Sequence, residues 1–233
     1  MSDHTSKQFD TDLESVRSKV LQMGGIVEQQ ITKAIEALDT GDLPLINAVI
    51  EGDAQVNKLE VEIDEACTQI IARRQPAATD LRVIHSIIKM ITDLERCGDE
   101  AAKIARMARS IAEANRHHLP RIEFKHMENT ALLMLRRALD AYARLDAVAA
   151  AAVVKDDDTV DDEFRAILRQ LITHMMQDPR TISRAIDLLF VSKALERIGD
   201  HAKNMCEYVV YLVKGRDVRH LAPDEIVEQA ARN

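Results

Sequence analysis

The chain of 233 residues has a mass of 26.2 kDa and a formal net charge of −8 at neutral pH. Seven glycines and five prolines are too few for the many turns of an all-β sandwich or barrel, and a composition led by Ala, Leu, Ile and charged residues favours helices. The acidic balance argues against nucleic acid as the main ligand. We therefore expect an all-α protein without a nucleic-acid partner.

Two further features predict a cytoplasmic protein. The longest unbroken apolar run, Ala147 to Val154, is far shorter than the roughly 18 residues that a membrane span needs. The N-terminal residues lack the basic region and apolar stretch of a secretion signal. Three widely spaced cysteines, Cys67, Cys97 and Cys206, predict reduced thiols packed in a core rather than a disulfide framework.

Apolar residues at helical spacing predict three helices in the first half of the chain. The first helix starts near residue 8 and ends just before Gly41, which begins a turn. The second continues until Pro76 breaks it. Thr79 or Asp80 can cap the third helix, which continues to about residue 115.

The second half repeats this plan. Helices are expected from about 120 to 145 and from about 147 to 176. Pro179 ends the second of these, and the last long helix continues to about residue 214, where Gly215 is a plausible C-cap. The tail is polar, with one short helix expected after Pro223.

An eight-residue motif occurs twice and relates the two halves. Residues 94–101 and 195–202 agree at six of eight positions and lie 101 residues apart. Earlier in each half the offset is 104, so that Met23 corresponds to Met127. Because short loops make neighbouring helices antiparallel, we expect two tandem up-down three-helix bundles built from six long helices. The predicted units are residues 1–115, residues 116–215 and a polar tail at 216–233.

The repeated motif places two carboxylates one helical turn apart in each half. Glu95 precedes Asp99 by four residues, and Glu196 precedes Asp200 by four. Like charges at this spacing repel each other by a few tenths of a kcal/mol, and each motif also carries a glycine in mid-helix, which costs about 1 kcal/mol relative to alanine. Because both halves keep these locally destabilising residues, we expect them to serve a purpose other than helix stability.

The geometry of a helical hairpin extends these pairs into clusters. Residues equidistant from the turn face each other, so each motif should lie level with polar residues of the preceding helix. These are Asp53 and Asn57 in the first half, and Asp157 and Asp161 in the second. Carboxylate clusters suit hard divalent or iron cations, whose charge cancels the repulsion. The alternative is a solvated acidic surface in which neighbouring arginines form intrahelical salt bridges.

The second cluster is expected to be the better metal site, because all four of its positions are carboxylates while Asn57 brings no charge to the first. Asn204, one turn after Asp200, is positioned to add an oxygen, whereas His201 points about 100° away. A ferritin-like di-iron site needs two Glu-x-x-His motifs, and the only one here ends at His126. No motif for nucleophilic catalysis is present, so we expect no enzyme activity.

Several of these features together resemble the PhoU family of bacterial regulators of phosphate uptake. They are the doubled Leu-Glu-Arg-x-Gly-Asp motif, the helix breaks at 74–76 and 176–179, Leu21-Gln22-Met23-Gly24, and the closing residues 211–215. The resemblance covers about residues 8 to 215 and implies two tandem three-helix bundles that bind multinuclear metal clusters on their surface. It assigns metal binding to Glu95, Asp99, Glu196 and Asp200, and by extension to Asp53, Asp157 and Asp161.

The resemblance also implies a regulatory role. Such proteins connect the phosphate ABC transporter, through its ATPase subunit, to a membrane sensor histidine kinase, and so repress phosphate-starvation genes. The chain would then be a homodimer that reaches the membrane only through partners. Two other functions remain open from the residues themselves: a carboxylate-bridged metalloenzyme, and a structural helical scaffold without metal.

Overall fold

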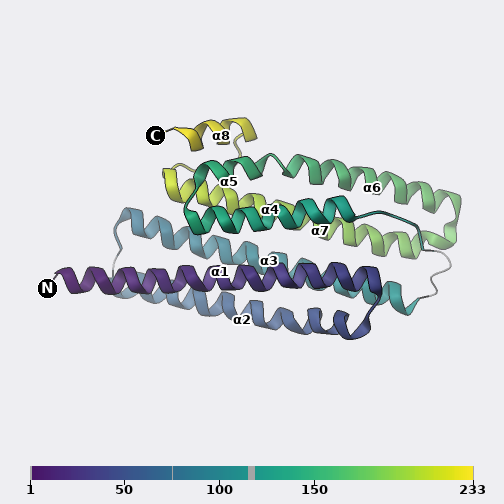
Figure 1. Ribbon diagram of the computed structural model, residues 1–233, viewed down its shortest axis with the longest axis horizontal. Coiled ribbons are helices and arrows are strands. Elements are labelled where there is room, and N and C mark those ends of the chain that lie inside the picture. Colours follow the sequence, from purple (N-terminus) through teal and green to yellow (C-terminus); the bar gives the residue numbers. More distant parts are fainter. Residues whose placement is uncertain (1, 75, 115–118, 233) are drawn as a thin grey trace.

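The computed structural model describes residues 2–74, 76–114 and 119–232, and its described residues form helices and no strands. Figure 1 shows long helices lying roughly along one axis. In chain order the elements are α1 (Ser2–Thr40), α2 (Leu43–Arg74), α3 (Ala78–Glu113), α4 (Lys125–Arg144), α5 (Ala147–Val154), α6 (Asp157–Gln177), a short 3-10 turn η2 (Pro179–Thr181), α7 (Ile182–Lys214) and α8 (Pro223–Ala231). The predicted all-α class is confirmed.

The first half forms its three helices close to the expected positions. Val20, Val27 and Ile31 of α1 are fully buried, which is the predicted apolar stripe. Gly41 has a φ of 70°, a left-handed conformation that glycine adopts without strain, and it turns the chain from α1 into α2. The cap of α3 differs from the prediction: Ala77 is the N-cap, in an extended conformation and without a side-chain hydrogen bond. The helix α3 therefore begins at Ala78, before Thr79 and Asp80, the two residues that were expected to cap it.

In the second half, one predicted helix is two. The segment expected to be helical from about 147 to 176 is interrupted after α5, and α6 starts at Asp157. At the interruption, the Asp156 side chain binds Arg137 of α4 at 2.5 Å, and its backbone N–H bonds three residues back to Val153. Negative charges in the first turn of α6 suit the positive end of its dipole. Gly215, with a φ of 72°, ends α7 as expected, and α8 is the predicted tail helix.

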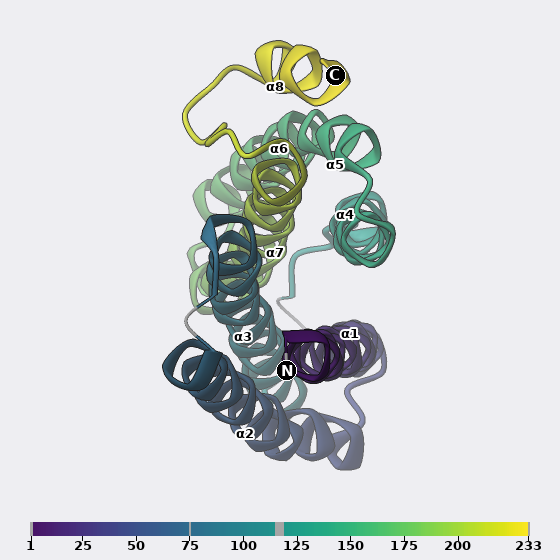
Figure 2. The ribbon, with the colours of Figure 1, turned by 90° about the vertical axis from the view of Figure 1, so that its left-hand side faces the viewer.

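The two halves pack on each other mainly through α3 and α7. Seen end-on in Figure 2, these helices occupy the middle, with α2 and α6 beyond them and with α1 and α4 to one side. Their junction is partly polar. Asp93, only 7% exposed, accepts hydrogen bonds from His201 Nδ1 at 2.6 Å and from the Asn204 amide at 3.2 Å. Arg197 Nε lies 3.1 Å from Glu100 Oε1 across the same junction.

The structure also bears on the predictions made for the cysteines and for membrane crossing. Cys67, Cys97 and Cys206 are buried and free, as predicted, and burial raises the pKa of the Cys67 thiol to about 12. None of the helices in the described part of the chain combines the length and apolarity that a membrane crossing requires.

Candidate metal-binding site

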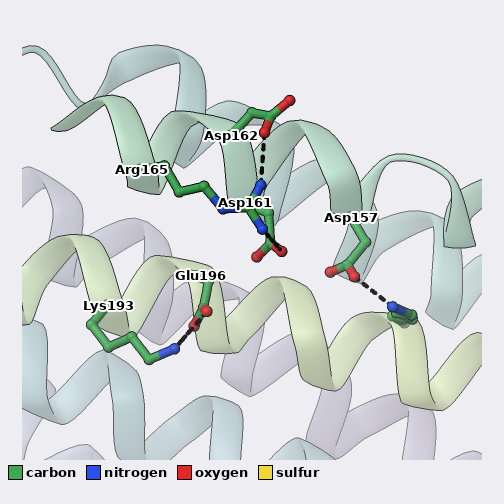
Figure 3. Close-up of polar contacts among 7 residues, drawn as sticks. Asp157, Asp161, Asp162, Arg165, Lys193 and Glu196 are labelled. Atoms are coloured by element: carbon green, nitrogen blue, oxygen red, sulfur yellow. Dashed lines mark hydrogen bonds and ion pairs between the residues drawn. The ribbon is translucent and has the colours of Figure 1, made fainter. Parts of the chain in front are cut away.

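The four predicted carboxylates of the second half lie together where α6 packs against α7. Figure 3 shows Asp157 and Asp161 directed from α6 toward the α7 helix that carries Glu196. Asp157 is 6% exposed and Glu196 is 9% exposed, so both are more buried than a solvated acidic surface would allow. We call these three residues and Asp200 the second cluster. The hairpin register therefore places the residues correctly, and the motif lies beside α6 rather than fully in open solvent.

Basic side chains contact three of the four carboxylates in the second cluster. Lys193 Nζ lies 2.5 Å from both oxygens of Glu196, and Lys203 Nζ lies 2.6 Å from Asp157 Oδ2. Arg165 binds Asp161 at 3.1 Å (Figure 3). The alternative of a solvated surface would pair Arg197 with the motif on its own helix, but Arg197 binds Glu100 of α3 instead.

Asp200 differs electrostatically from its neighbours in the second cluster. Burial raises the pKa of its carboxyl to about 6, and the negative charges of Glu196 and Asp157 add to the shift. Lys193 opposes the shift without cancelling it. Like charges close together in a partly desolvated place repel one another, and a bound cation would relieve that repulsion.

The first half gathers a comparable set between α2 and α3. Burial and the nearby Asp99 raise the pKa of Asp53. The pKa of Glu95 is raised by burial and then by Asp99, Glu60 and Asp53. The prediction that Asp53 lies level with the motif is therefore supported by mutual repulsion. We call Asp53, Glu60, Glu95 and Asp99 the first cluster.

Glu60 is a member of the first cluster that the sequence argument missed. It follows Asp53 by seven residues, which puts both on one face of α2. Burial raises its pKa, with contributions from Asp64 and Asp99. The seven-residue spacing could have identified Glu60 as a member of the cluster. The repeat could not, because the corresponding residue of the second half is Phe164.

The two clusters also differ in the bases that surround them. Applying the repeat offsets, the positions of Lys193, Arg165 and Lys203 are occupied in the first half by Thr92, Val61 and Ala102. The first cluster instead has Arg96, whose Nε lies 3.7 Å from Glu95, and the more distant charge of Arg106 near Asp53. A cation entering the second cluster must displace ion pairs that the first cluster lacks at the equivalent positions. This finding argues against the predicted ranking of the two sites.

The donor atoms fit a hard cation, although their present arrangement is open. Carboxylate oxygens are the ligands that hard divalent cations prefer, and Asp53 Oδ1 is buried without a hydrogen-bond partner. Across the ranges 2–74, 76–114 and 119–232, no three His, Cys, Asp or Glu side chains converge closely enough to hold a metal ion. Side-chain rotation within each cluster would have to accompany binding.

Three other candidate side chains are directed elsewhere. The amide of Asn204 donates to Asp93 of α3, and His201 binds the same carboxylate, so both belong to the junction between the halves. His126 contacts Glu163 of α6 at the surface. None of the three joins a carboxylate cluster through these contacts.

Both the sequence and the fold of this chain match known proteins. The family model described as the PhoU domain matches residues 20–108 and 124–209, once in each half. The phosphate-specific transport system accessory protein PhoU homolog of Pseudomonas aeruginosa is 47% identical over 233 residues, which covers 100% of this chain and 96% of that protein. The Escherichia coli K12 protein named phosphate-specific transport system accessory protein PhoU is 45% identical over 227 residues, 97% of this chain and 93% of its own.

Solved structures agree with this relationship. The crystal structure of PhoU from Pseudomonas aeruginosa has a TM-score of 0.86 and 49% identity, and the match covers 89% of this chain and 100% of that one. The structure of the phosphate transport system regulatory protein PhoU from Streptococcus pneumoniae has a TM-score of 0.83 at 29% identity, over 90% of this chain and 99% of that one. The chain therefore belongs to the PhoU family.

Proposed function

We propose that this protein is a non-catalytic regulator of phosphate uptake and of the phosphate-starvation response. In this role it acts in the cytoplasm as a homodimeric helical adaptor between the ATPase subunit of the phosphate ABC transporter and a sensor histidine kinase. The observation that carries the proposal is the family match in both halves, together with relatives named as accessory proteins of phosphate-specific transport.

The proposal includes metal binding at the two carboxylate clusters. A bound divalent or iron cation supplies positive charge to a cluster where carboxylates repel one another. Each cluster has four acidic side chains, and the pKa of Asp200 and of Glu95 is raised by burial and by their acidic neighbours. Loading would change the local charge of the α2–α3 and α6–α7 faces. Because charge complementarity governs specificity in docking, this change gives the clusters a means of selecting partners.

A deletion strain tests the regulatory role directly. The strain would lack its own copy of the gene, carry a reporter for a phosphate-starvation promoter and express this chain from a plasmid. We expect repression in phosphate-rich medium and none in phosphate-poor medium. A reporter that stays on in rich medium, despite normal amounts of folded protein, would refute the regulatory role.

Partner binding needs a separate measurement. The tagged protein would be isolated after growth in phosphate-rich and phosphate-poor media, and the transporter ATPase subunit and the kinase would be detected with specific antibodies. We expect both to be recovered in greater amount from rich medium. Recovery of neither, with the transporter present in the extract, would contradict the adaptor role even if repression were restored.

A further inference from the structure

A buried glutamine of α1 points into the first cluster without a partner. Gln30 is 6% exposed, and both its Oε1 and its Nε2 are buried and make no hydrogen bond. Asp53 Oδ1 is buried and unpartnered in the same way. Buried amides and carboxylates are normally paired, because leaving their polar atoms unsatisfied destabilises the fold. Two such groups side by side therefore require an explanation.

Two glycines open the space that these groups share. A Cβ atom on Gly98 of α3 would lie 3.4 Å from Gln30 Oε1 and 3.4 Å from Asp53 Oδ1. A Cβ atom on Gly52 of α2 would lie 3.2 Å from Gln30 Nε2. The amide of Gln30 thus reaches from α1 to the place where α2 and α3 meet, next to the carboxylate that faces the cluster.

The second half shows that the fold itself does not need a polar group there. At the repeat offset of 104, Gln30 corresponds to Met134 of α4, which is completely buried. Gly98 corresponds to Gly199, where the three atoms nearest to an added Cβ all belong to the apolar side chain of Val160, at 3.5 to 3.7 Å. One half therefore fills this position with an apolar side chain, while the other keeps an amide beside its acidic cluster.

We propose that Gln30 is a positioning residue of the first cluster, which orients Asp53 toward a bound cation. The proposal rests on the metal binding proposed above. A half-turn of the Gln30 amide would direct its N–H₂ toward Asp53 Oδ1. The Asn57 side chain already forms a hydrogen bond with the Asp53 carboxylate, so the two amides together would hold that carboxylate in one orientation beside the cation. Outer-shell partners of this kind fix the orientation of ligating carboxylates, and their loss typically weakens metal binding 10- to 100-fold.

The test compares Gln30→Met, which installs the residue of the second half, with Gln29→Met. Gln29 is the exposed neighbour on α1, so its replacement is the same chemical change outside the cluster. Both variants would be made with Glu196→Ala and Asp200→Ala in the background, so that the first cluster dominates the titration. The probe is Mn²⁺, which suits oxygen ligands and whose free ion is counted by electron paramagnetic resonance. Thermal unfolding with chelator reports the metal-free fold.

We expect Gln30→Met to raise the dissociation constant for Mn²⁺ by about 10-fold or more, with a metal-free unfolding midpoint that is unchanged or higher. Gln29→Met should change neither. A dissociation constant for Gln30→Met within twofold of its background would overturn the role of Gln30 and leave metal binding intact. A lower metal-free midpoint would instead make Gln30 a structural residue. A background protein that binds no Mn²⁺ would refute metal binding by the first cluster and this inference with it.

Discussion

Replacing Asp200 with asparagine should stabilise the metal-free protein above pH 6. The pKa of Asp200 is raised from 3.8 to about 6, first by burial and then by Glu196 and Asp157. The folded state therefore prefers the protonated form. Stability from this preference is fully present below about pH 4 and is lost as the pH rises to about 6. Asparagine keeps the shape of the protonated carboxyl and cannot ionise, so the variant avoids this loss.

The size of the effect follows from the shift. About two pKa units correspond to roughly 3 kcal/mol if the environment were fully dry. Asp200 is only partly buried and lines an open surface hollow of α7 that water and salt reach, so we expect roughly 1 to 1.5 kcal/mol. For a chain of this length, each kcal/mol raises the midpoint of thermal unfolding by about 2 to 4 °C. The variant should therefore melt about 2 to 6 °C higher at pH 8.

Circular dichroism at pH 8 and at pH 4.5, with chelator present, measures this difference. Glu51→Gln is the matched control, because it removes one negative charge from an exposed position on α2. The advantage of Asp200→Asn should be large at pH 8 and small at pH 4.5, while the control should shift little at either. An equal rise in the unfolding midpoint at both pH values, or the same rise in the control, would show that ionisation of Asp200 within the cluster does not destabilise the fold.

Four further outcomes are expected. Changing Glu196 and Asp200 together to alanine should lower the metal content without unfolding the bundle, and it should weaken repression. Elemental analysis that shows unchanged metal would contradict the assignment of these residues as metal ligands. The matched pair Glu95→Ala with Asp99→Ala decides the ranking of the sites, because a larger loss of metal than in the first pair would show that the basic side chains around the second cluster weaken its binding of metal. Asp93→Ala should cost about 1 to 3 kcal/mol, seen as a lower urea midpoint, because two α7 donors at the junction lose their acceptor. Sedimentation at micromolar concentration should show a dimer, and a monomer throughout would contradict the expected assembly.

The periodicity of apolar residues was sufficient to predict the fold, because a buried stripe every three or four residues leaves few alternatives to helices. The repeat at 101 residues then predicted two halves with the same order of helices. Neither pattern predicted the interruption after α5. At that break Asp156, in the turn before α6, forms an ion pair with Arg137 of α4, a contact that exists only once the helices have packed. Helix ends set by tertiary contacts are hidden from local patterns.

The candidate site was predictable to a similar extent. Hairpin register correctly placed Asp53 beside Asp99, because distance along two antiparallel helices is fixed by counting residues from the turn. The bases were harder to foresee. Lys193 is three residues from Glu196 and was readable as a helical neighbour, but Lys203 reaches Asp157 from another helix. Charge at a site depends on side chains that converge only after the helices pack.

The order of the helices along the chain has a consequence for synthesis on the ribosome. The helices α1, α2 and α3 are consecutive, so the first half can fold while the second is still being made. Its partner helix α7 follows about 100 residues later, a delay of roughly 5 to 20 s at usual rates of translation. During that interval the face of α3 that later meets α7 is open to water. Asp93 and Glu100 on that face give the nascent half a charged surface, which keeps it soluble until its complement emerges.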